Sequence, residues 1–588
     1  MKSDDDVTFK GLFFPLTTKK AIVFIFIIGF LIFFNGFFNG FVGDDVSQIT
    51  DNINVHSISN IVTFFSGSTF YSGGREVLFG VYYKPVLSIS YALIYNLFGN
   101  STLAYHSLEI FLHIINASLL FVFFKRLFSK NLSFILSIIF LVHPINSEVA
   151  FYVSNLQDAL FFFFGFSAIL ILQRYNSQQA VLFSSFLLLL SLLSKETGIL
   201  FFITGLVFVF LYYKDKFKSL TTYLSLSFVL YLVLRVHAVG LFTNTFSAPI
   251  QKLNLIERIF NIPEMFLFYI KTFFFPLNLA VSYHWFYITP DFLHFVLPLF
   301  IDLIFLLVLT VITSYFYKRT THKNFILFSF FTFWFLLGLA FHLQIIPLDA
   351  TVADRWFYFP IVGLLGMIAV LAEQFRINLK SNYVVLLIIL IISLLSLRTY
   401  IRSFDWKDPL TLARHDLTVS PKAFNLESGL GASYFELGNY EQAKIHAEKS
   451  IKLFPNMFNY TNLGGALFCL GDYKDAKKAN LNALKYGQYY ATYENLAGLS
   501  IIYGNAKTDI NFIKNQALTR YPYDSKLWFY LAVLEYKNNM IKDAKMSITN
   551  AYLLDKGDVT SFVYKVITNN MPLQLKVKNG RVSYISPL

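Results

Sequence analysis

The sequence predicts an all-α fold in which a polytopic transmembrane helical bundle is followed by an α-solenoid. Three observations lead to this prediction. The chain has 588 residues, of which 56% are hydrophobic, 19% aromatic and only 14% charged. These values exclude a soluble globular protein and a disordered chain. Long apolar runs recur up to about residue 400, and beyond Arg402 the composition becomes polar and a segment of about 34 residues repeats.

The charge balance fits a membrane protein. Forty-eight Lys and Arg residues against 35 Asp and Glu residues give a formal net charge of +13. In a polytopic chain this excess is typical of cytoplasmic loops, so we expect no nucleic-acid partner. The single cysteine, Cys469, excludes an intrachain disulfide. No small-residue cleavage site follows the first apolar run, so we expect it to be a retained span.

Eleven apolar segments are candidate transmembrane helices, each near the length of about 20 residues that a bilayer requires. Basic clusters occur before the first span and after every second one, so all of them fall on the side of the N-terminus. The positive-inside rule then predicts a cytoplasmic N-terminus and an external C-terminal part, in the periplasm, outside the cell or in a lumen. The spans are 20–42, 103–124, 131–147, 158–173, 178–194, 197–213, 219–239, 292–316, 324–342, 358–373 and 383–400.

The stretch 240–290 is ambiguous. Its amphipathic residues, together with Pro263 and Pro276, favour one helix that lies at the membrane interface. Two further spans would preserve the same orientation, so they remain an alternative.

The polar part of the chain contains a repeat. "LGASYFELGNYEQA" (430–443) recurs as "LGGALFCLGDYKDA" (463–476), with weaker copies at 496–509 and 531–544. This spacing and pattern match the tetratricopeptide repeat. Small residues at Gly431 and Ala443 would let the two helices of a hairpin touch. We expect a concave groove that binds a peptide, with a rigid spacer or a dimerisation element as the alternative.

These observations divide the chain into four parts. A transmembrane domain over 1–402 is followed by a linker over 403–420 and a repeat solenoid over 421–570. Residues 571–588 form a C-terminal cap or tail, where Asn579-Gly580 is a hairpin turn signal.

The unusual polar residues are predicted to gather at the external membrane face. Each has a structural explanation when taken singly, as a solvated helix end, a local ion pair or a snorkelling anchor. Charge beside a bilayer is nevertheless costly and usually functional, and several coincidences at one face favour a site. They lie in Asp44-Asp45, "YYKP" (82–85), "HPINSE" (143–148), "SKET" (194–197), Arg235 and "ADRWFYFP" (353–360).

The order of these motifs resembles a known family. "FVGDDVSQI", "YYKPVLSIS", "FLVHPINSEV", "LLSKET" and "ADRWFYFP", followed by repeats, resemble the transmembrane and tetratricopeptide-repeat O-mannosyltransferases (TMTC family) of the GT-C superfamily. The resemblance covers essentially the whole chain. Lys84 stands where the family has Arg, Asn146 replaces a His, and Asp354 replaces Glu. These departures indicate a distant relative, with room for another sugar or acceptor.

The resemblance implies a membrane glycosyltransferase. It would move a sugar from a polyprenyl-phosphate donor to a hydroxyl, on Ser or Thr of a protein, at the external face and with inversion. It places the general base in the acidic pair, with Asp44 as the first choice. Asp45 would orient the acceptor or bind a divalent cation. A divalent cation is the one cofactor that the sequence leaves as a possibility to test. His106, Glu109 and His113 share one helix face, which is more typical of a buried polar stripe than of a metal site.

The leaving phosphate requires positive charge as its bond to the sugar breaks. Lys84, Arg235 and Arg355 are the first candidates to bind the donor phosphate, with Lys195 and His143 behind them. Tyr83, Glu148, Glu196 and Asp354 are expected to support the site.

Other functions remain open. A ligase of the same superfamily would move a lipid-linked glycan onto another lipid or a polysaccharide. A non-catalytic assembly scaffold would use the repeats to bind protein. A transporter would carry polar residues at mid-bilayer on several spans, which this sequence does not favour. The expected partners are the lipid-linked sugar, an acceptor protein held by the repeat groove, and the lipid bilayer.

Overall fold

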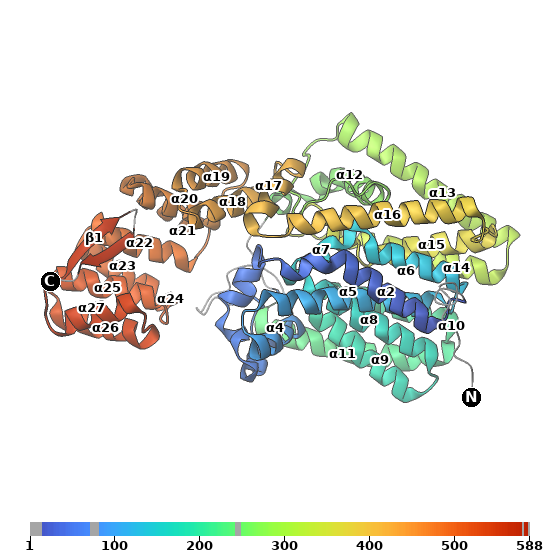
Figure 1. Ribbon diagram of the computed structural model, residues 1–588, viewed down its shortest axis with the longest axis horizontal. Helices are drawn as coiled ribbons and strands as arrows, with labels where there is room; N and C mark the ends of the chain where they lie inside the picture. The colour runs from blue at the N-terminus through green and yellow to red at the C-terminus, as the bar shows by residue number, and fades with distance from the viewer. Residues whose placement is uncertain (1–14, 71–81, 241–247, 579–580, 586–588) are drawn as a thin grey trace, which may run out of the picture. The chain divides into compact units, whose positions relative to one another are not determined.

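The computed structural model describes residues 15–70, 82–240, 248–578 and 581–585 (Figure 1). Within these ranges the chain is helical apart from one small hairpin, which confirms the predicted all-α class. The chain divides into two compact units. Among the described residues, the first unit comprises 15–50, 54–69, 82–240 and 248–420, and the second comprises 51–53, 70, 421–578 and 581–585.

The first unit is built from helices α2 to α17, joined by short 3₁₀ and π turns. The helices are α2 (Thr18–Phe33), α3 (Ile61–Ser66), α4 (Pro85–Phe98), α5 (Thr102–Phe124), α6 (Lys130–Val142), α7 (Ser147–Phe151), α8 (Leu156–Arg174), α9 (Gln178–Ser194), α10 (Ile199–Tyr212), α11 (Lys214–Val239), α12 (Leu255–Phe274), α13 (Leu297–Arg319), α14 (His322–Ala340), α15 (Pro360–Gln374), α16 (Asn382–Asp405) and α17 (Pro409–Val419).

The number of helices that are long and apolar enough to cross a membrane is smaller than the eleven predicted spans. In the described part of the chain, seven helices are long and apolar enough to cross a membrane, and an eighth forms if α6 and the segment Pro144–Phe151 count as one span bent by 52°. The three remaining predicted spans form the shorter helices α9, α10 and α15. These three helices have 17, 14 and 15 residues, so whether each crosses the membrane stays a prediction. The protein is a multi-pass membrane protein. The seven helices are Thr18–Phe38, Thr102–Phe124, Val153–Arg174, Lys214–Val239, Phe292–Arg319, His322–Ala340 and Asn382–Asp405.

One helix, α12, occupies the ambiguous stretch between α11 and α13 within residues 248–290. Its start is fixed by a capping box, in which the Glu257 N–H donates to Asn254 Oδ1 (3.0 Å) and the Asn254 N–H donates to Glu257 Oε2 (2.8 Å). Pro263 lies inside the helix. The described residues therefore form one helix here and not two.

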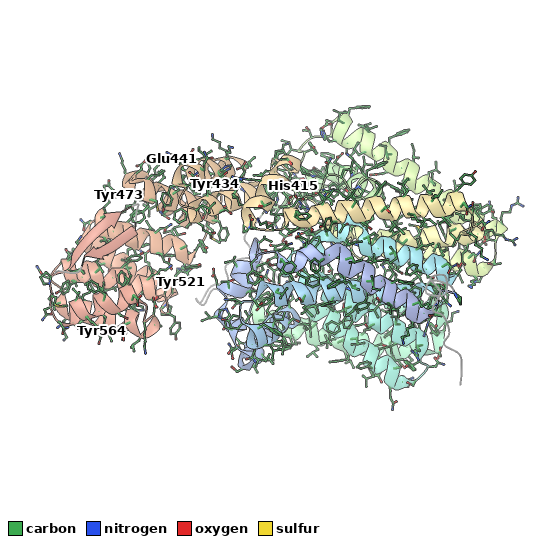
Figure 2. The ribbon with its side chains drawn as sticks, in the orientation of Figure 1. His415, Tyr434, Glu441, Tyr473, Tyr521 and Tyr564 are labelled. Carbon is green, nitrogen blue, oxygen red and sulfur yellow. The ribbon has the colours of Figure 1, made fainter. Side chains whose placement is uncertain are left out.

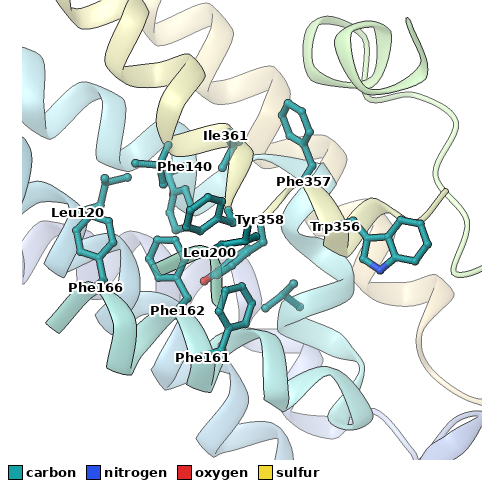
Figure 3. Packing of buried hydrophobic residues seen from close by; sticks show 14 of the residues in the cluster. Leu120, Phe140, Phe161, Phe162, Phe166, Leu200, Trp356, Phe357, Tyr358 and Ile361 are labelled. Atoms are coloured by element: carbon teal, nitrogen blue, oxygen red, sulfur yellow. The ribbon is translucent and has the colours of Figure 1, made fainter. Parts of the chain in front are cut away.

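Aromatic rings fill the core of the first unit (Figure 3). The ring of Tyr358 lies 4.9 Å from that of Phe162 and 5.1 Å from that of Phe140. Its hydroxyl contacts His113 Nδ1 (2.9 Å) and accepts from Asn116 Nδ2 (3.2 Å). Buried tyrosines of this kind combine apolar contact with a satisfied polar group. This packing holds the short helix η10 (Asp354–Phe357) against α5, which positions Arg355.

The predicted linker over 403–420 instead contains α17 and clusters with the first unit. The buried guanidinium of Arg402 donates to both carboxylate oxygens of Asp416, at 2.6 and 2.9 Å. Asp416 also accepts from the Val281 N–H (2.7 Å). A bidentate pair with a further hydrogen bond is a strong attachment, so the polar composition here marks the end of the membrane segment and not a flexible connection.

The second unit consists of helices packed in successive pairs, and each predicted repeat copy spans the turn within one pair. A Cβ placed on Gly431 of α18 would lie 3.2 Å from the Ala443 carbonyl of α19, so the small residues permit the predicted close approach. Membership in the tetratricopeptide class stays a prediction. The pairs are α18 (Phe424–Glu436) with α19 (Tyr440–Leu453), α20 (Met457–Leu470) with α21 (Tyr473–Tyr486), α22 (Tyr490–Ile502) with α23 (Ala506–Phe512), η11 (Ile513–Ala517) and α24 (Leu518–Arg520), and α25 (Ser525–Lys537) with α26 (Ile541–Leu554), followed by α27 (Asp558–Thr568).

The C-terminal segment forms an antiparallel pair of strands, β1 (Gln574–Lys578) and β2 (Arg581–Ile585). The predicted turn at Asn579-Gly580 lies outside the described residues. Figure 2 shows the side chains of the helical repeats, among them Tyr434, whose ring stacks on that of His446 at 5.4 Å.

Candidate functional site

A tight loop after the first span positions the acidic pair. Gly43 has a φ of +51°, and a Cβ at this position would lie 2.7 Å from Tyr152 Oη. Glycine is the residue that tolerates both the backbone angle and the close approach. The next backbone N–H, that of Asp44, donates to the same Tyr152 oxygen (2.9 Å). The backbone of Asp44 is therefore fixed against the segment that follows α7.

Asp45 is directed into the protein and is fully buried. Its Oδ1 accepts from the backbone N–H (2.7 Å) and the hydroxyl (2.6 Å) of Ser154, and its Oδ2 accepts from the Val42 N–H (3.0 Å). Burial raises the pKa of Asp45 to about 7 against these donors. Its oxygens hold the loop, so the geometry does not support the predicted role of Asp45 in orienting an acceptor or binding a divalent cation.

Asp44 has the opposite environment. Its carboxylate is half-buried and accepts no hydrogen bond from any residue that the structure describes. Burial raises the pKa of Asp44, the charges of Arg355 and Lys84 lower it, and that of Asp349 raises it again. The net shift is upward, and the four groups share one electrostatic environment. The structure thus brings together Asp44, Lys84 and Arg355 from three distant parts of the sequence.

Lys84 is a buried cation at the start of α4. Its backbone N–H donates to Thr69 Oγ1 (3.1 Å), and its Nζ lies 4.3 Å from the centre of the Tyr82 ring. Burial lowers the pKa of Lys84, against the opposing charges of Glu196 and Asp349. Among the described residues no carboxylate forms an ion pair with it, which leaves its charge available to an anion.

Glu148 holds Arg355. The buried Glu148 carboxylate accepts from the Arg355 backbone N–H (3.0 Å), from Arg355 Nη1 and from Asn155 Nδ2 (3.0 Å). Burial opposes the guanidinium charge, but Glu148 and Asp349 together raise the pKa of Arg355 above its ordinary value, so it stays cationic. Its other guanidinium nitrogens make no hydrogen bond to the described residues. They are available to a phosphate.

Asp349 is a site residue that sequence reasoning missed. It accepts from the Tyr82 hydroxyl (2.7 Å). Burial favours protonation, but Arg355, this hydrogen bond and Lys84 lower the pKa of Asp349 below its ordinary value. The sequence holds no specific signal for this role, because Asp349 lies outside the motif "ADRWFYFP" (353–360) and its partner Tyr82 is 267 residues away.

Glu196 joins Arg235 and Tyr83 to the same region. Its Oε1 accepts from Arg235 Nη1 (2.8 Å) and weakly from the Tyr83 N–H (3.4 Å). Burial would raise the pKa of Glu196, but Lys84 and Arg235 together lower it. Tyr83 itself is buried, and its hydroxyl donates to the Phe65 carbonyl (3.2 Å). Arg235 and Arg355 are each paired with a glutamate, but the charge of Arg355, and not that of Arg235, acts on the pKa of Asp44. Arg235 is therefore a weaker candidate for the donor phosphate than Lys84 or Arg355.

The side chains of His143 and Asp354 are engaged by other groups of the protein. His143 Nε2 lies 2.9 Å from the Phe273 carbonyl and Nδ1 accepts from the Ile145 N–H (3.2 Å), so the imidazole is neutral with both nitrogens occupied. The phosphate-binding role predicted for His143 is therefore not supported. Asp354 is buried, accepts from the Tyr283 hydroxyl (3.3 Å), and has a pKa that burial raises well above the ordinary value.

No group of three His, Cys, Asp or Glu residues that could hold a metal ion occurs within the described ranges. His106 Nδ1 lies 3.4 Å from Glu109 Oε2 inside the bundle. His113 instead contacts Tyr358 and the Leu141 carbonyl. The three residues form a buried polar stripe on α5.

Comparison with known proteins adds a separate line of evidence. The model of a family described as dolichyl-phosphate-mannose-protein mannosyltransferase matches residues 84–239. A Caenorhabditis elegans protein named protein O-mannosyl-transferase F38B6.6 is 27% identical over 436 residues, which are 70% of this chain and 60% of that protein. The chain is similar to protein O-mannosyl-transferases. The resemblance inferred from the motifs is thereby confirmed.

Two further relatives match shorter regions. Human protein O-mannosyl-transferase TMTC3 is 28% identical over 26% of this chain and 18% of its own length. Drosophila melanogaster protein O-mannosyl-transferase Tmtc2 is 32% identical over 18% of this chain and 11% of its own length. The chain thus spans about three fifths of the C. elegans protein and smaller shares of the others. The family match at 84–239 includes Lys84, Glu196 and Arg235 but neither Asp44 nor Arg355.

Proposed function

We propose that the protein transfers mannose from a polyprenyl-phosphate donor to the hydroxyl of Ser or Thr in an acceptor protein. One observation carries this proposal: the carboxylate of Asp44 shares its surroundings with Lys84 and Arg355 and accepts no hydrogen bond from the described residues. The names of the relatives support the sugar and the protein acceptor. The family description, with its dolichyl-phosphate-mannose, supports the lipid-linked donor.

Asp44 is the proposed general base. A hydroxyl at neutral pH is a poor nucleophile, and a carboxylate within hydrogen-bond reach takes its proton as the oxygen attacks. The new bond joins the acceptor oxygen to the anomeric carbon, the bond from that carbon to the phosphate oxygen breaks, and the proton ends on Asp44. A pKa raised by burial suits this task, because it brings the carboxylate closer to the working pH.

Lys84 and Arg355 are the proposed phosphate ligands. The leaving group is polyprenyl phosphate, a phosphate monoester and a weak base, so it needs positive charge more than a proton. Arg355 keeps guanidinium nitrogens available although Glu148 occupies Nη1. Lys84 supplies a buried point charge from a different element. Attack from the face opposite the phosphate in one step gives inversion at the anomeric carbon.

The orientation and the repeats complete the proposal. The distribution of basic residues supports a cytoplasmic N-terminus, which puts the Asp44 loop and the C-terminal unit on the external or luminal side. Residues 1–402 would carry the chemistry. The helix pairs within 421–570 would act as tetratricopeptide repeats whose groove holds the acceptor protein, and the segment after 570 would cap them.

Donor consumption tests the proposal. Purified full-length protein is incubated with radiolabelled polyprenyl-phosphate mannose and a membrane-free protein extract. We expect loss of the donor and appearance of acid-stable label in protein that alkaline β-elimination releases. Label in lipid or polysaccharide would favour the ligase alternative, and a donor that stays intact with every acceptor would reject the proposed activity.

A further inference from the structure

A small cavity within the first unit is lined in part by Arg355. Its empty volume is about 190 Å³, and the part that a water-sized group can occupy is close to that of one water molecule. Phe161, Leu200 and Phe359 form its apolar wall. The lining is completed by Asp158, Lys195, Thr197, His342, Arg355 and Trp356.

Two oxygens of this lining lack a hydrogen bond. Asp158 is buried, and its Oδ1 accepts from Lys195 Nζ (2.6 Å), but its Oδ2 has no partner among the described residues. The hydroxyl of Thr197 likewise has no hydrogen-bond partner among the described residues. A buried oxygen without a partner costs about 1 to 3 kcal/mol, so these two oxygens are positioned to bind a polar group that enters the cavity.

His342 supplies a third polar group. Its Nδ1 donates to the Gly338 carbonyl (2.8 Å), which leaves Nε2 as an acceptor on the neutral ring. Burial and the nearby charges of Lys195 and Arg355 lower the pKa of His342 to about 3, so the ring stays neutral at physiological pH. The imidazole is stacked on Trp356, with ring centres 5.0 Å apart. The ring is therefore fixed in orientation.

These groups fit a hydroxyl and not a phosphate. A carboxylate oxygen and an imidazole acceptor repel an anion, whereas an O–H group can donate to one of them and accept from Thr197 Oγ1. The cation that would otherwise attract phosphate, Lys195, is already neutralised by Asp158 at 2.6 Å. The volume admits one oxygen and not a whole sugar ring.

We propose that this cavity receives one hydroxyl group of the donor sugar, with Asp158 Oδ2 as its acceptor and Thr197 as its second contact. The inference rests on the proposed function and adds the residues that select the sugar. Arg355 lines the cavity, and its charge also acts on Asp44. Arg355 would therefore contact the phosphate while Asp158 and Thr197 bind a hydroxyl of the attached sugar ring. Lys195, predicted as a phosphate ligand, instead positions Asp158.

The experiment uses full-length protein and five donors: polyprenyl-phosphate mannose and its 2-, 3-, 4- and 6-deoxy analogues. For the wild type we expect one deoxy donor to lose about a hundredfold or more in kcat/KM relative to mannose, because a site built around a hydroxyl strongly rejects the analogue that lacks it. Thr197→Val and Asp158→Asn should each reduce that one penalty to a few-fold while the penalties for the other three donors stay unchanged. In Asp158→Asn, Oδ1 still accepts from Lys195.

Thr204→Val is the matched control, because Thr204 is buried in α10 with an equally unpartnered hydroxyl but does not line the cavity. It should leave all four penalties at the wild-type values. Variants that slow every donor by the same factor would show a merely structural role and overturn the inference. Wild-type protein that uses mannose and all four analogues equally would also overturn it, with the proposed function intact. Wild-type protein that consumes no donor would reject the proposed function itself.

Discussion

Asp44 and Asp45 are neighbours in the sequence, but their carboxylates have opposite surroundings. Asp45 is fully buried and accepts three hydrogen bonds from Val42 and Ser154, whereas the Asp44 carboxylate accepts none from the part of the chain that the structure describes. Adjacent side chains cannot point in the same direction, so one carboxylate fixes the loop while the other is available to a substrate. The pair therefore combines a structural and a chemical role in two successive residues.

Asp45 is predicted to contribute stability. Asp45→Ala leaves the Val42 N–H and both Ser154 donors without their acceptor, at a cost of about 1 to 3 kcal/mol for each buried group left unsatisfied. We expect a clear fall in the thermal midpoint in detergent, measured by tryptophan fluorescence. Asp45→Asn should lose less, because an amide oxygen still accepts from Ser154. An unchanged midpoint for Asp45→Ala would contradict the structural role.

The pH dependence of transfer should report Asp44. The ionised Asp44 carboxylate is the active form, so the transfer rate should rise with pH as Asp44 loses its proton. Because the pKa of Asp44 is raised, this rising limb of the pH profile should lie above the ordinary pKa of Asp. Asp349→Asn removes a negative charge that raises this pKa and should move the limb to lower pH. Lys84→Met removes a positive charge that lowers it and should move the limb to higher pH.

These two shifts are measured as kcat/KM against pH in a constant-ionic-strength buffer. Their opposite signs are the test, because a loss of folded protein would reduce the rate at every pH without moving the limb. Shifts in the same direction for both variants would exclude Asp44 as the titrating base.

Arg355 should bind the donor more strongly than Arg235 does. Arg355→Lys removes the planar fork and should raise KM for the donor about tenfold to a hundredfold, which corresponds to about 1.4 to 2.7 kcal/mol. Arg235→Lys is the matched control, because Arg235 is also paired with a glutamate but is not among the charges that act on Asp44, and it should change KM only a few-fold. Steady-state kinetics with a fixed peptide acceptor distinguish the two. An equal increase in KM for the two variants would exclude Arg355 as a ligand of the donor phosphate.

The C-terminal unit should act on the acceptor and not on the chemistry. Because residues up to Ser420 cluster with the first unit, a chain ending there keeps the Arg402–Asp416 attachment. We expect it to transfer sugar to a short Ser/Thr peptide at close to the full rate and to an intact acceptor protein at a rate reduced about tenfold or more. Parallel assays with the two acceptors measure this. An equal loss for both would indicate a structural tail.

Sequence alone singled out several residues that share one electrostatic environment in the structure, but not all of their relationships. The basic clusters, which occur before the first predicted span and after every second one, assigned Asp44, Lys84 and Arg355 to the external face of the membrane. The structure places these three residues in one electrostatic environment. Asp349 was missed because its role depends on a hydrogen bond from Tyr82, 267 residues away in the sequence. A motif pattern does not contain such a contact.

Two other predictions depend on side-chain contacts and helix lengths that a sequence pattern does not contain. His143 lies in a motif that suggests chemistry, but backbone groups at Phe273 and Ile145 occupy both of its nitrogens. Of the eleven predicted spans, three form helices shorter than 18 residues, such as α15, and their crossing of the membrane stays a prediction. Hydropathy measures the composition of a helix and not the length available to cross a bilayer.

The most direct test of the central claim compares Asp44→Asn with the wild type in a single-turnover assay with radiolabelled polyprenyl-phosphate mannose and a Ser/Thr peptide. Donor affinity and thermal midpoint are measured on the same preparations, and Asp51→Asn, a change of the same kind seven residues along the chain, is the control. We expect Asp44→Asn to bind the donor normally and to transfer at least about a hundredfold more slowly, the usual contribution of a general base. Transfer at the wild-type rate by a folded Asp44→Asn protein would contradict the account.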